Sequence, residues 1–436
     1  MPNRTSKFAF AFLFSSFFAF IAVLADRAQS QQVLLWFPMN GKSYFVLGAN
    51  YPWYNGFRGL DLGPYLGTKT IATVAYATPK EGKRGNAEVW ENGHDLQRPS
   101  IPIRTGTTGF NADGIKAQLQ DARSVGIHAL RWFFGDDGRS FIIFDGHDNC
   151  TGIDKTALQN VDRVLALAQS NQVYIVPVLF DFRFICGDHW LRYEDGSSGL
   201  GQGHAEVIRD SAKRRLLIEN FIKPLVKRCA SSSAVLYWEI MNEAGNVVQG
   251  TDPVTGFTMG GPGKVSNHPN VSVVEMQTFM NEVYDAIKSV DQAHLVMPSG
   301  LGRPWQLPLV VGRVKADLFG AHYNDDGNTD YGTVQSVANI KSNLFRKFGL
   351  VLDKPLIMTE GTSQMEGHLD YYVRSAFDGG WAGYLAWSYY SLVGLNNFNR
   401  YPRIVVSKDG RAGSSVNIDF YRMFNRDHES AVRIGQ

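Results

Sequence analysis

Short apolar runs alternate along the chain with stretches in which apolar residues recur every three or four positions. The runs have the length of buried strands, and the period of the intervening stretches is that of a helix with one buried face. Strands are predicted at residues 45–49, 128–133, 173–180, 235–242, 295–298, 318–322, 355–359 and 382–387. From residue 113 onward the alternation of strand and helix patterns is regular, which favours a single parallel sheet.

The helical stretches carry their own start and stop signals. Asp113 is suited to cap a helix that buries Ile115, Leu119 and Ala122 on one face. Pro224 is expected to kink a long helix that leads into the fourth strand. Further helices are predicted near residues 158–168, 208–229, 276–287, 334–344 and 371–380.

Eight strands alternating with helices predict a (β/α)8 TIM barrel, in which active groups collect at the C-terminal ends of the strands. Residues 55–112 are rich in Gly, Pro and Thr and lack a helical period, so we expect a long insertion after strand 1. The alternative is an open, doubly wound sheet. A dinucleotide-binding version of that sheet would need a Gly-rich phosphate loop after an early strand, and the sequence has none there.

The N-terminus has the pattern of a targeting segment. Arg4 and Lys7 precede an apolar run at 8–25, and small residues follow it. We expect residues 1–30 to be a cleaved signal peptide and residues 31–436 to form one secreted catalytic domain without stable membrane association. The alternative is an uncleaved anchor, because the run is at the short end of what spans a bilayer.

Composition narrows the choice of partners. Lys and Arg (43) nearly cancel Asp and Glu (41), and the sequence has no basic run with interleaved aromatics, so a nucleic-acid partner is not expected. Cys150 and Cys186 follow neighbouring strands and are able to form a disulfide in an exported protein, whereas Cys229 is expected to be buried and free. The cysteine spacing is not that of a metal site, and we expect no metal, no cofactor and a monomer.

Two glutamates follow buried strands. Asn242 and Glu243 end the run WEIMNE, and Glu360 follows KPLIMT. Because barrel strands converge at their C-terminal ends, these carboxyls are expected to face each other. One carboxyl can then protonate the leaving oxygen of a glycoside, while the other attacks the anomeric carbon or activates water.

Other strand ends add groups that suit a sugar site. An arginine keeps a neighbouring carboxylate ionised, and an indole offers a flat apolar face to a pyranose. Asp136 and Asp137 are adjacent without a spaced third ligand, which is a weak cation pattern. The candidates are Asn50, Trp53, Arg131, His322, Tyr323 and Trp387, with Asp181, His189 and Trp190 as weaker ones.

These motifs resemble clan A of the glycoside hydrolases and, within it, family 5, the cellulase and mannanase family. The resemblance implies a retaining barrel with Glu243 as acid/base after strand 4 and Glu360 as nucleophile after strand 7. It also implies that Arg131 contacts the nucleophile and that Asn242 contacts the sugar 2-hydroxyl. His322 and Trp387 match the histidine of strand 6 and the tryptophan of strand 8.

The sequence departs from the family pattern at three places. Ala244 follows the Asn-Glu pair where the family usually has proline. The family tyrosine two residues after the strand 6 histidine is replaced by Asn324, with Tyr323 adjacent to the histidine instead. The strand 3 histidine has no match, since Asp181 stands at that strand end.

We therefore expect a secreted retaining β-glycoside hydrolase that cleaves β-mannan or β-glucan through a glycosyl-enzyme. Retention requires carboxyl groups about 5–5.5 Å apart, whereas inversion requires roughly 6.5–9.5 Å. The alternatives are an exo-acting β-glycosidase and a carbohydrate-binding pseudoenzyme on the same barrel. A barrel lyase or metal-dependent hydrolase would need a lysine base or a ligand set at the strand ends. The predicted substrate-binding residues are Arg131, Asn242, His322, Tyr323, Trp387, Asn50 and Trp53.

Overall fold

The structure is a computed structural model. It describes residues 37–39, 42–51, 60–74, 103–124, 127–187, 191–197, 203–260, 271–323, 334–362 and 369–387. The expected signal peptide and the chain after residue 387 lie outside these residues, as do Trp53, His189 and Trp190.

Eight parallel strands close into a barrel, which confirms the predicted (β/α)8 fold. Every strand predicted from the apolar runs is present, within a few residues of its expected bounds. The barrel strands in chain order are β3 (Val46–Asn50), β5 (Ala129–Phe133), β8 (Tyr174–Asp181), β10 (Tyr237–Asn242), β14 (Leu295–Leu301), β15 (Phe319–Tyr323), β16 (Leu356–Thr362) and β17 (Gly383–Trp387).

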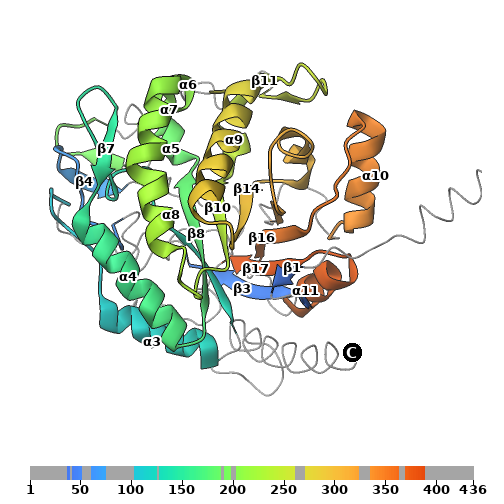
Figure 1. The fold of residues 1–436 in the computed structure, drawn as a ribbon, viewed down its shortest axis with the longest axis horizontal. Coiled ribbons are helices and arrows are strands. Elements are labelled where there is room, and N and C mark those ends of the chain that lie inside the picture. Colours follow the sequence, from blue (N-terminus) through green and yellow to red (C-terminus); the bar gives the residue numbers. More distant parts are fainter. Residues whose placement is uncertain are drawn as a thin grey trace, which may run out of the picture.

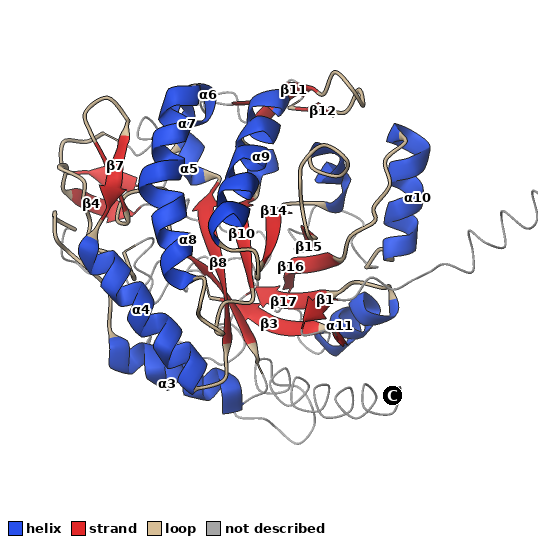
Figure 2. Ribbon diagram, viewed as in Figure 1, coloured by secondary structure: helices blue, strands red, loops and turns tan. Residues whose placement is uncertain are grey.

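Helices surround the barrel, as Figures 1 and 2 show. They bury the faces that the sequence period predicts; Ile115, Leu119 and Ala122 of α3, for example, are all buried. The outer helices are α3 (Ala112–Ser124), α4 (Lys155–Ser170), α5 (Arg183–Cys186), α6 (Ala205–Arg209), α7 (Ser211–Leu217), α8 (Lys223–Cys229), α9 (Val273–Val290), α10 (Val337–Phe348) and α11 (Leu369–Asp378). Within the described part of the chain, none of the helices combines the length and apolarity that a membrane-spanning helix needs.

The helix expected to kink at Pro224 contains a π-helical turn instead of a break. The turn η2 (Ile218–Ile222) joins α7 to α8, and the N–H of Lys223 bonds the carbonyl of Ile218. Proline has no N–H and crowds the carbonyl four residues earlier, so a wider turn just before it relieves that contact.

Different elements cover the two ends of the barrel. At the N-terminal end, the hairpin of β1 (Phe37–Met39) and β2 (Lys42–Tyr44) packs Phe37 against Tyr237, with ring centroids 5.9 Å apart. At the C-terminal end, short elements surround the mouth, namely β4 (Ile71–Val74), β6 (Ile142–Phe144), β7 (Cys150–Ile153), β9 (Leu191–Tyr193), η3 (Ala244–Asn246), β11 (Val248–Thr251), β12 (Thr258–Met259), β13 (Val271–Ser272) and η4 (Pro304–Leu309).

The described parts of the predicted insertion form a small satellite core. Strand β4 pairs antiparallel with β9, and Leu60, Tyr65, Ile71, Ile103 and Tyr193 bury one another there. Cys150, Cys186 and Cys229 are all buried and free, so the disulfide that the sequence permits is not formed and the expectation for Cys229 is confirmed.

Candidate active site

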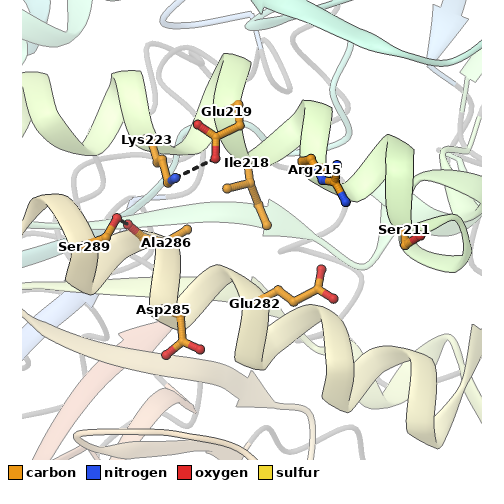
Figure 3. Close-up of a pocket in the computed structure, with 9 residues that line it drawn as sticks. All are labelled: Ser211, Arg215, Ile218, Glu219, Lys223, Glu282, Asp285, Ala286 and Ser289. Atoms are coloured by element: carbon orange, nitrogen blue, oxygen red, sulfur yellow. Dashed lines mark hydrogen bonds and ion pairs between the residues drawn. The ribbon is translucent and has the colours of Figure 1, made fainter.

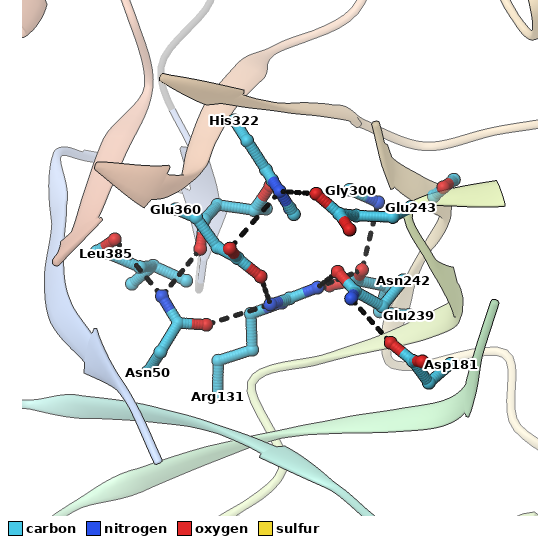
Figure 4. Close-up of polar contacts among 12 residues, drawn as sticks. Asn50, Arg131, Asp181, Glu239, Asn242, Glu243, Gly300, His322, Glu360 and Leu385 are labelled. Carbon is cyan, nitrogen blue, oxygen red and sulfur yellow. Dashed lines mark hydrogen bonds and ion pairs between the residues drawn. The ribbon is translucent and has the colours of Figure 1, made fainter. Parts of the chain in front are cut away.

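The polar residues at the strand ends converge around one buried arginine, as Figure 4 shows. Arg131 lies on β5, is fully buried, and uses all five of its N–H groups. Its acceptors are Glu239 at 2.7 and 2.6 Å, Asn50 at 2.8 Å, Asn242 at 2.7 Å and Glu360 at 2.9 Å. Burial alone would lower its pKa, but the charges of Glu239 and Glu360 outweigh burial and raise it, so the guanidinium stays charged.

Glu360 enters the site where the register of β16 shifts. The pairing of β16 with β17 is irregular between Met358 and Gly361, and that of β15 shifts next to His322. Such irregularities redirect side chains locally. They allow Glu360, whose side chain is 5% exposed, to meet Arg131 at 2.9 Å and His322 at 3.3 Å.

Glu243 follows β10 in a left-handed conformation, with φ 48° and ψ 38°. That region is uncommon for residues other than glycine and costs on the order of 1 kcal/mol or more. The N–H of Glu243 donates to the carbonyl of Gly300 at 2.8 Å, and Asn246 donates to its carboxylate at 2.9 Å. The turn therefore directs the carboxylate into the mouth, where the side chain is 20% exposed.

His322 stands between the two carboxylates. Its Nδ1 is 3.1 Å from Glu243 and 3.3 Å from Glu360, so Nδ1 faces two acceptors and carries a hydrogen. Its Nε2 is buried and has no hydrogen-bond partner among the described residues. The imidazole therefore fixes the two carboxylates relative to each other, and one oxygen of each lies within 4.8 Å of the other.

The charges around Glu243 favour its ionised form. Burial would raise its pKa, but the hydrogen bond and charge of His322, together with Arg303 and Arg131, hold it below the ordinary value. The carboxyl of Glu243 is therefore protonated only under acidic conditions.

Asn242 joins the arginine to a second buried charge cluster. Its oxygen accepts from Arg131, and its amide donates to Asp181 at 2.7 Å. Asp181 pairs with Arg183 at 2.6 Å, and Arg183 also reaches Asp136 at 3.2 Å. Burial is the main cause that raises the pKa of Asp181, and burial raises that of Asp136 to about 7.

Two predicted substrate residues have other surroundings. The amide of Asn50 donates to main-chain carbonyls of Thr359, Leu385 and Ala386, and Asn50 is fully buried, so it supports Arg131 rather than facing the mouth. Tyr323 follows His322 on β15, and successive residues of a strand point to opposite faces.

The contacts of Tyr323 agree with that outward direction. Its hydroxyl accepts from the N–H of Gln335 at 3.1 Å, and its ring meets Trp381 edge-on at 6.5 Å. The predicted substrate contact of Tyr323 therefore finds no support in this placement. Trp387, by contrast, is partly exposed on the inner side beside Phe133, with ring centroids 6.5 Å apart.

Sequence reasoning missed Glu239 and Trp305. Glu239 is a fully buried carboxylate inside WEIMNE, and a charged residue within an otherwise apolar strand was the available signal. Trp305 is 55% exposed in η4. The loop just before it passes Glu243, because a Cβ on Gly302 would lie 3.1 Å from the Glu243 carboxylate. A tryptophan just after a strand end was the signal there.

The same residues bear on metal binding. Glu243, His322 and Glu360 each offer a ligand atom within 4.8 Å of the others. A cation there would have to displace the hydrogen of His322 Nδ1 that bridges the carboxylates. The arrangement is complete as a hydrogen-bonded acid pair without a metal.

A second hollow lies on the outer surface, away from the strand ends. Figure 3 shows this groove, about 380 Å³ in volume, between α7, η2 and α8 on one side and α9 on the other. Its acidic residues are paired locally, since Glu219 pairs with Lys223, Glu282 with Arg214, and Asp285 with Lys315. The groove contributes no group to the barrel mouth.

Comparison with known proteins gives the same fold. No protein-family model matches the chain. A stretch of 191 residues, 42% of this chain, is 26% identical to the mannan endo-1,4-beta-mannosidase of Mytilus edulis. That stretch covers 47% of the relative, so the chain spans about half the length of the curated relative that it matches.

Solved structures with a similar barrel include three beta-mannanases. The structure superposes on that of Mytilus edulis with a TM-score of 0.57 and 18% identity, over 88% of this chain and 93% of that one. With the beta-1,4-mannanase of Aplysia kurodai the TM-score is 0.58 at 18% identity, over 86% of this chain and 98% of that one. With the endo-1,4-beta-mannanase of Eisenia fetida the TM-score is 0.56 at 18% identity, over 88% of this chain and 97% of that one. The resemblance to family 5 that the motifs indicate is confirmed at the level of the fold.

Proposed function

We propose that the chain is a secreted, retaining β-glycoside hydrolase that cleaves β-mannan internally. The observation that supports it most is the pair of strand-end carboxylates, Glu243 and Glu360, with oxygens within 4.8 Å of each other. An approach this close is nearer to the spacing of retaining enzymes, about 5–5.5 Å between carboxyl groups, than to the roughly 6.5–9.5 Å of inverting ones, and it favours retention.

The two glutamates then divide the chemistry. Glu360 attacks the anomeric carbon as Glu243 gives its proton to the departing sugar oxygen, which forms a glycosyl-enzyme. Glu243, now ionised, removes a proton from water, and the water displaces Glu360 with a second inversion. Arg131 keeps Glu360 ionised and fixed in direction, because a charged donor at 2.9 Å favours the carboxylate form.

Sugar contacts are available around this pair. Asn242 lies at the end of β10, next to Glu243, where its amide can hydrogen-bond the 2-hydroxyl of the bound sugar. Trp387 offers an aromatic face on the inner side of the barrel. Trp305 offers a second one on the loop beside Glu243, and such faces suit the apolar side of a pyranose.

The choice of mannan rests on the names of the relatives, which state mannanases, and the choice of internal cleavage rests on the two of these names that state endo action. The proposal of secretion rests on the N-terminal pattern of residues 1–30. Product analysis on β-mannan, cellulose, mixed-linkage glucan and aryl β-glycosides tests the substrate. We expect mannan to give a series of manno-oligosaccharides of decreasing length. Release of single sugars from one end would replace the endo-acting form of the proposal by an exo-acting one.

The mechanism has its own test. Proton NMR during the first minutes of hydrolysis should show the β anomer of the new reducing end. Glu360→Ala should abolish turnover, and azide should restore it with an α-glycosyl azide as product, because azide then takes the place of the nucleophile. Glu219→Gln, at an exposed helix pair with Lys223, is the matched control and should keep wild-type turnover.

Two results would contradict the proposal. Near-wild-type hydrolysis by Glu360→Ala without azide would remove Glu360 as nucleophile. A saturable mannan-binding isotherm with no product after long incubation of the wild-type protein would identify a carbohydrate-binding pseudoenzyme instead.

A further inference from the structure

The carboxylate of Glu239 lies inside the barrel, one layer below the mouth. Glu239 is fully buried on β10 and bonds Nε and Nη2 of Arg131 at 2.7 and 2.6 Å. The N–H of Gly300 donates to the same carboxylate at 2.9 Å. Such a two-point pairing fixes the plane of a guanidinium as well as its position. Glu239 therefore determines where the remaining nitrogen of Arg131, Nη1, points.

That remaining nitrogen is the one that serves the nucleophile. Nη1 donates to Glu360 at 2.9 Å and to Asn50 at 2.8 Å. The arginine thus carries one positive charge for two buried carboxylates, Glu239 and Glu360. Arg131 makes two hydrogen bonds to Glu239 and one to Glu360. The negative charge of Glu239 therefore weakens the attraction between Arg131 and Glu360.

Gly300 extends the effect to the other glutamate. Its N–H bonds Glu239, and its carbonyl accepts from the N–H of Glu243. A Cβ at this position would lie 2.7 Å from Thr359 Oγ1, 2.8 Å from the Glu239 carboxylate and 3.0 Å from His322 Nε2. Only glycine lets these groups pack against the strand, so Glu239 and the backbone of Glu243 are bridged by a single residue, Gly300.

We propose that Glu239 is a positioning residue of the active site, which directs Arg131 onto Glu360 and, through the main chain of Gly300, sets the turn that carries Glu243. It touches neither the sugar nor the reacting atoms. The inference rests on the proposed glycosidase function. The competing explanation is that Glu239 only neutralises a buried charge and holds the barrel together.

Two variants separate the charge of Glu239 from its reach. Glu239→Gln keeps the length of the side chain but leaves the whole charge of Arg131 on Glu360. Glu239→Asp keeps the charge but is too short to preserve both bonds to Arg131. Among the described residues, the charged or titratable groups that face Glu360 include Arg131 from β5, His322 from β15 and Glu243 after β10, and neither variant replaces any of these three.

The expected results differ between the variants. For Glu239→Gln we expect kcat to fall by about 10²-fold with KM nearly unchanged. We also expect the acid limb of the kcat/KM profile to move to lower pH, because an unshared arginine favours ionised Glu360 more strongly. For Glu239→Asp we expect a lower kcat with the acid limb where the wild type has it.

The measurement is kcat, KM and the pH profile of each purified, folded variant on a soluble aryl β-mannoside, with folding checked by circular dichroism. Wild-type kcat and acid limb in folded Glu239→Gln would overturn the inference, and so would a kcat loss accounted for by the unfolded fraction alone. If Glu239→Gln does not fold, an acid limb that moves in Glu239→Asp overturns it. An inactive wild type would contradict the proposed function instead, so the two failures are distinguishable.

Discussion

At the scale of single residues, the proposed acid/base role of Glu243 depends on His322. Its Nδ1 bonds Glu243 at 3.1 Å and, with the nearby arginines, holds the pKa of that carboxyl below its ordinary value despite burial. In the proposed mechanism, protonated Glu243 is the form that drives the first step. The alkaline limb of the kcat/KM profile should therefore lie in the acid range.

Replacing His322 tests this relation. Removal of a group that lowers the pKa of Glu243 raises that pKa, so the proton is retained to higher pH. We expect His322→Ala to move the alkaline limb upward while kcat falls by about 10²-fold, the typical loss on removing one positioned donor. The measurement is the pH profile of kcat/KM on a substrate with a poor leaving group. Dinitrophenyl glycosides, which need no protonation, serve as the control, and an alkaline limb that stays or moves down would contradict the assignment.

Trp305 gives a second test at this scale. The ring is 55% exposed on the loop beside Glu243, and sugar stacking on an indole contributes about 1 kcal/mol. We expect Trp305→Ala to raise KM for mannan by about 5–10-fold with little change in kcat, as initial-rate measurements would show. Phe345→Ala removes an equally exposed aromatic, 63% exposed, from α10 and should leave KM unchanged. Equal effects of the two substitutions would argue against a sugar contact at Trp305.

At the scale of elements, apolar runs predicted all eight strands because a barrel strand is buried on both faces. They did not predict which polar side chain turns inward. That depends on register, and the register of β15 and β16 shifts beside His322 and Glu360. The sequence places Tyr323 in the site because it directly follows His322. Successive residues of a strand, however, point to opposite faces of the sheet.

Glu239 shows a second limit of the sequence. Its partner Arg131 is 108 positions away, and nothing local to WEIMNE reveals that pairing. A buried carboxylate in a strand costs several kcal/mol unless a distant charge meets it. A charged residue in an apolar strand was therefore a signal that Glu239 has a partner. Which partner it has follows only from the barrel, in which β8 lies between β5 and β10.

Strand β14 offers a prediction at the same scale. Gly300→Ala places a Cβ 2.7–3.0 Å from Thr359, Glu239 and His322, distances shorter than real Cβ contacts allow. We expect a loss of about 1–3 kcal/mol in the free energy of unfolding and a fall in kcat, because the strand must shift under Glu243. Denaturant unfolding and initial rates measure the two effects. Gly152→Ala, where a Cβ meets nothing within 4 Å, is the control, and equal behaviour of the two variants would contradict the close packing.

At the scale of the whole molecule, one chain of polar contacts crosses the barrel from the tip of β5 to Glu360. Its links measure 3.2, 2.6, 2.7, 2.7 and 2.9 Å. The chain with its branch holds four buried carboxyls and two guanidinium groups, so the carboxyls are not all equally compensated. The residues in order are Asp136, Arg183, Asp181, Asn242, Arg131 and Glu360, with Glu239 as a branch on Arg131.

Asp136 is the poorly compensated member. It is fully buried, its Oδ2 has no hydrogen-bond partner among the described residues, and Arg183 is nearer to Asp181. Burial, opposed by the charge of Arg183, raises the pKa of Asp136 from 3.8 to about 7. The folded state therefore binds more protons than the unfolded state between these values. The stability that this group contributes is fully present below about pH 4 and is lost as the pH rises through 7.

Asp136→Asn should separate this pH-dependent contribution from the rest of the stability. Asparagine tolerates the positive φ of 41° and can still accept from Arg183, but it carries no charge to bury. We expect the variant to exceed the wild type in free energy of unfolding by about 1–3 kcal/mol at pH 8 and by much less at pH 5, measured by denaturant unfolding at both pH values. Asp162→Asn, at an exposed pair with Arg228, is the control and should change stability by less than about 0.5 kcal/mol at either pH. A variant that is less stable than the wild type at pH 8 would mean that ionised Asp136 is compensated after all, and that the excess charge of the network resides elsewhere.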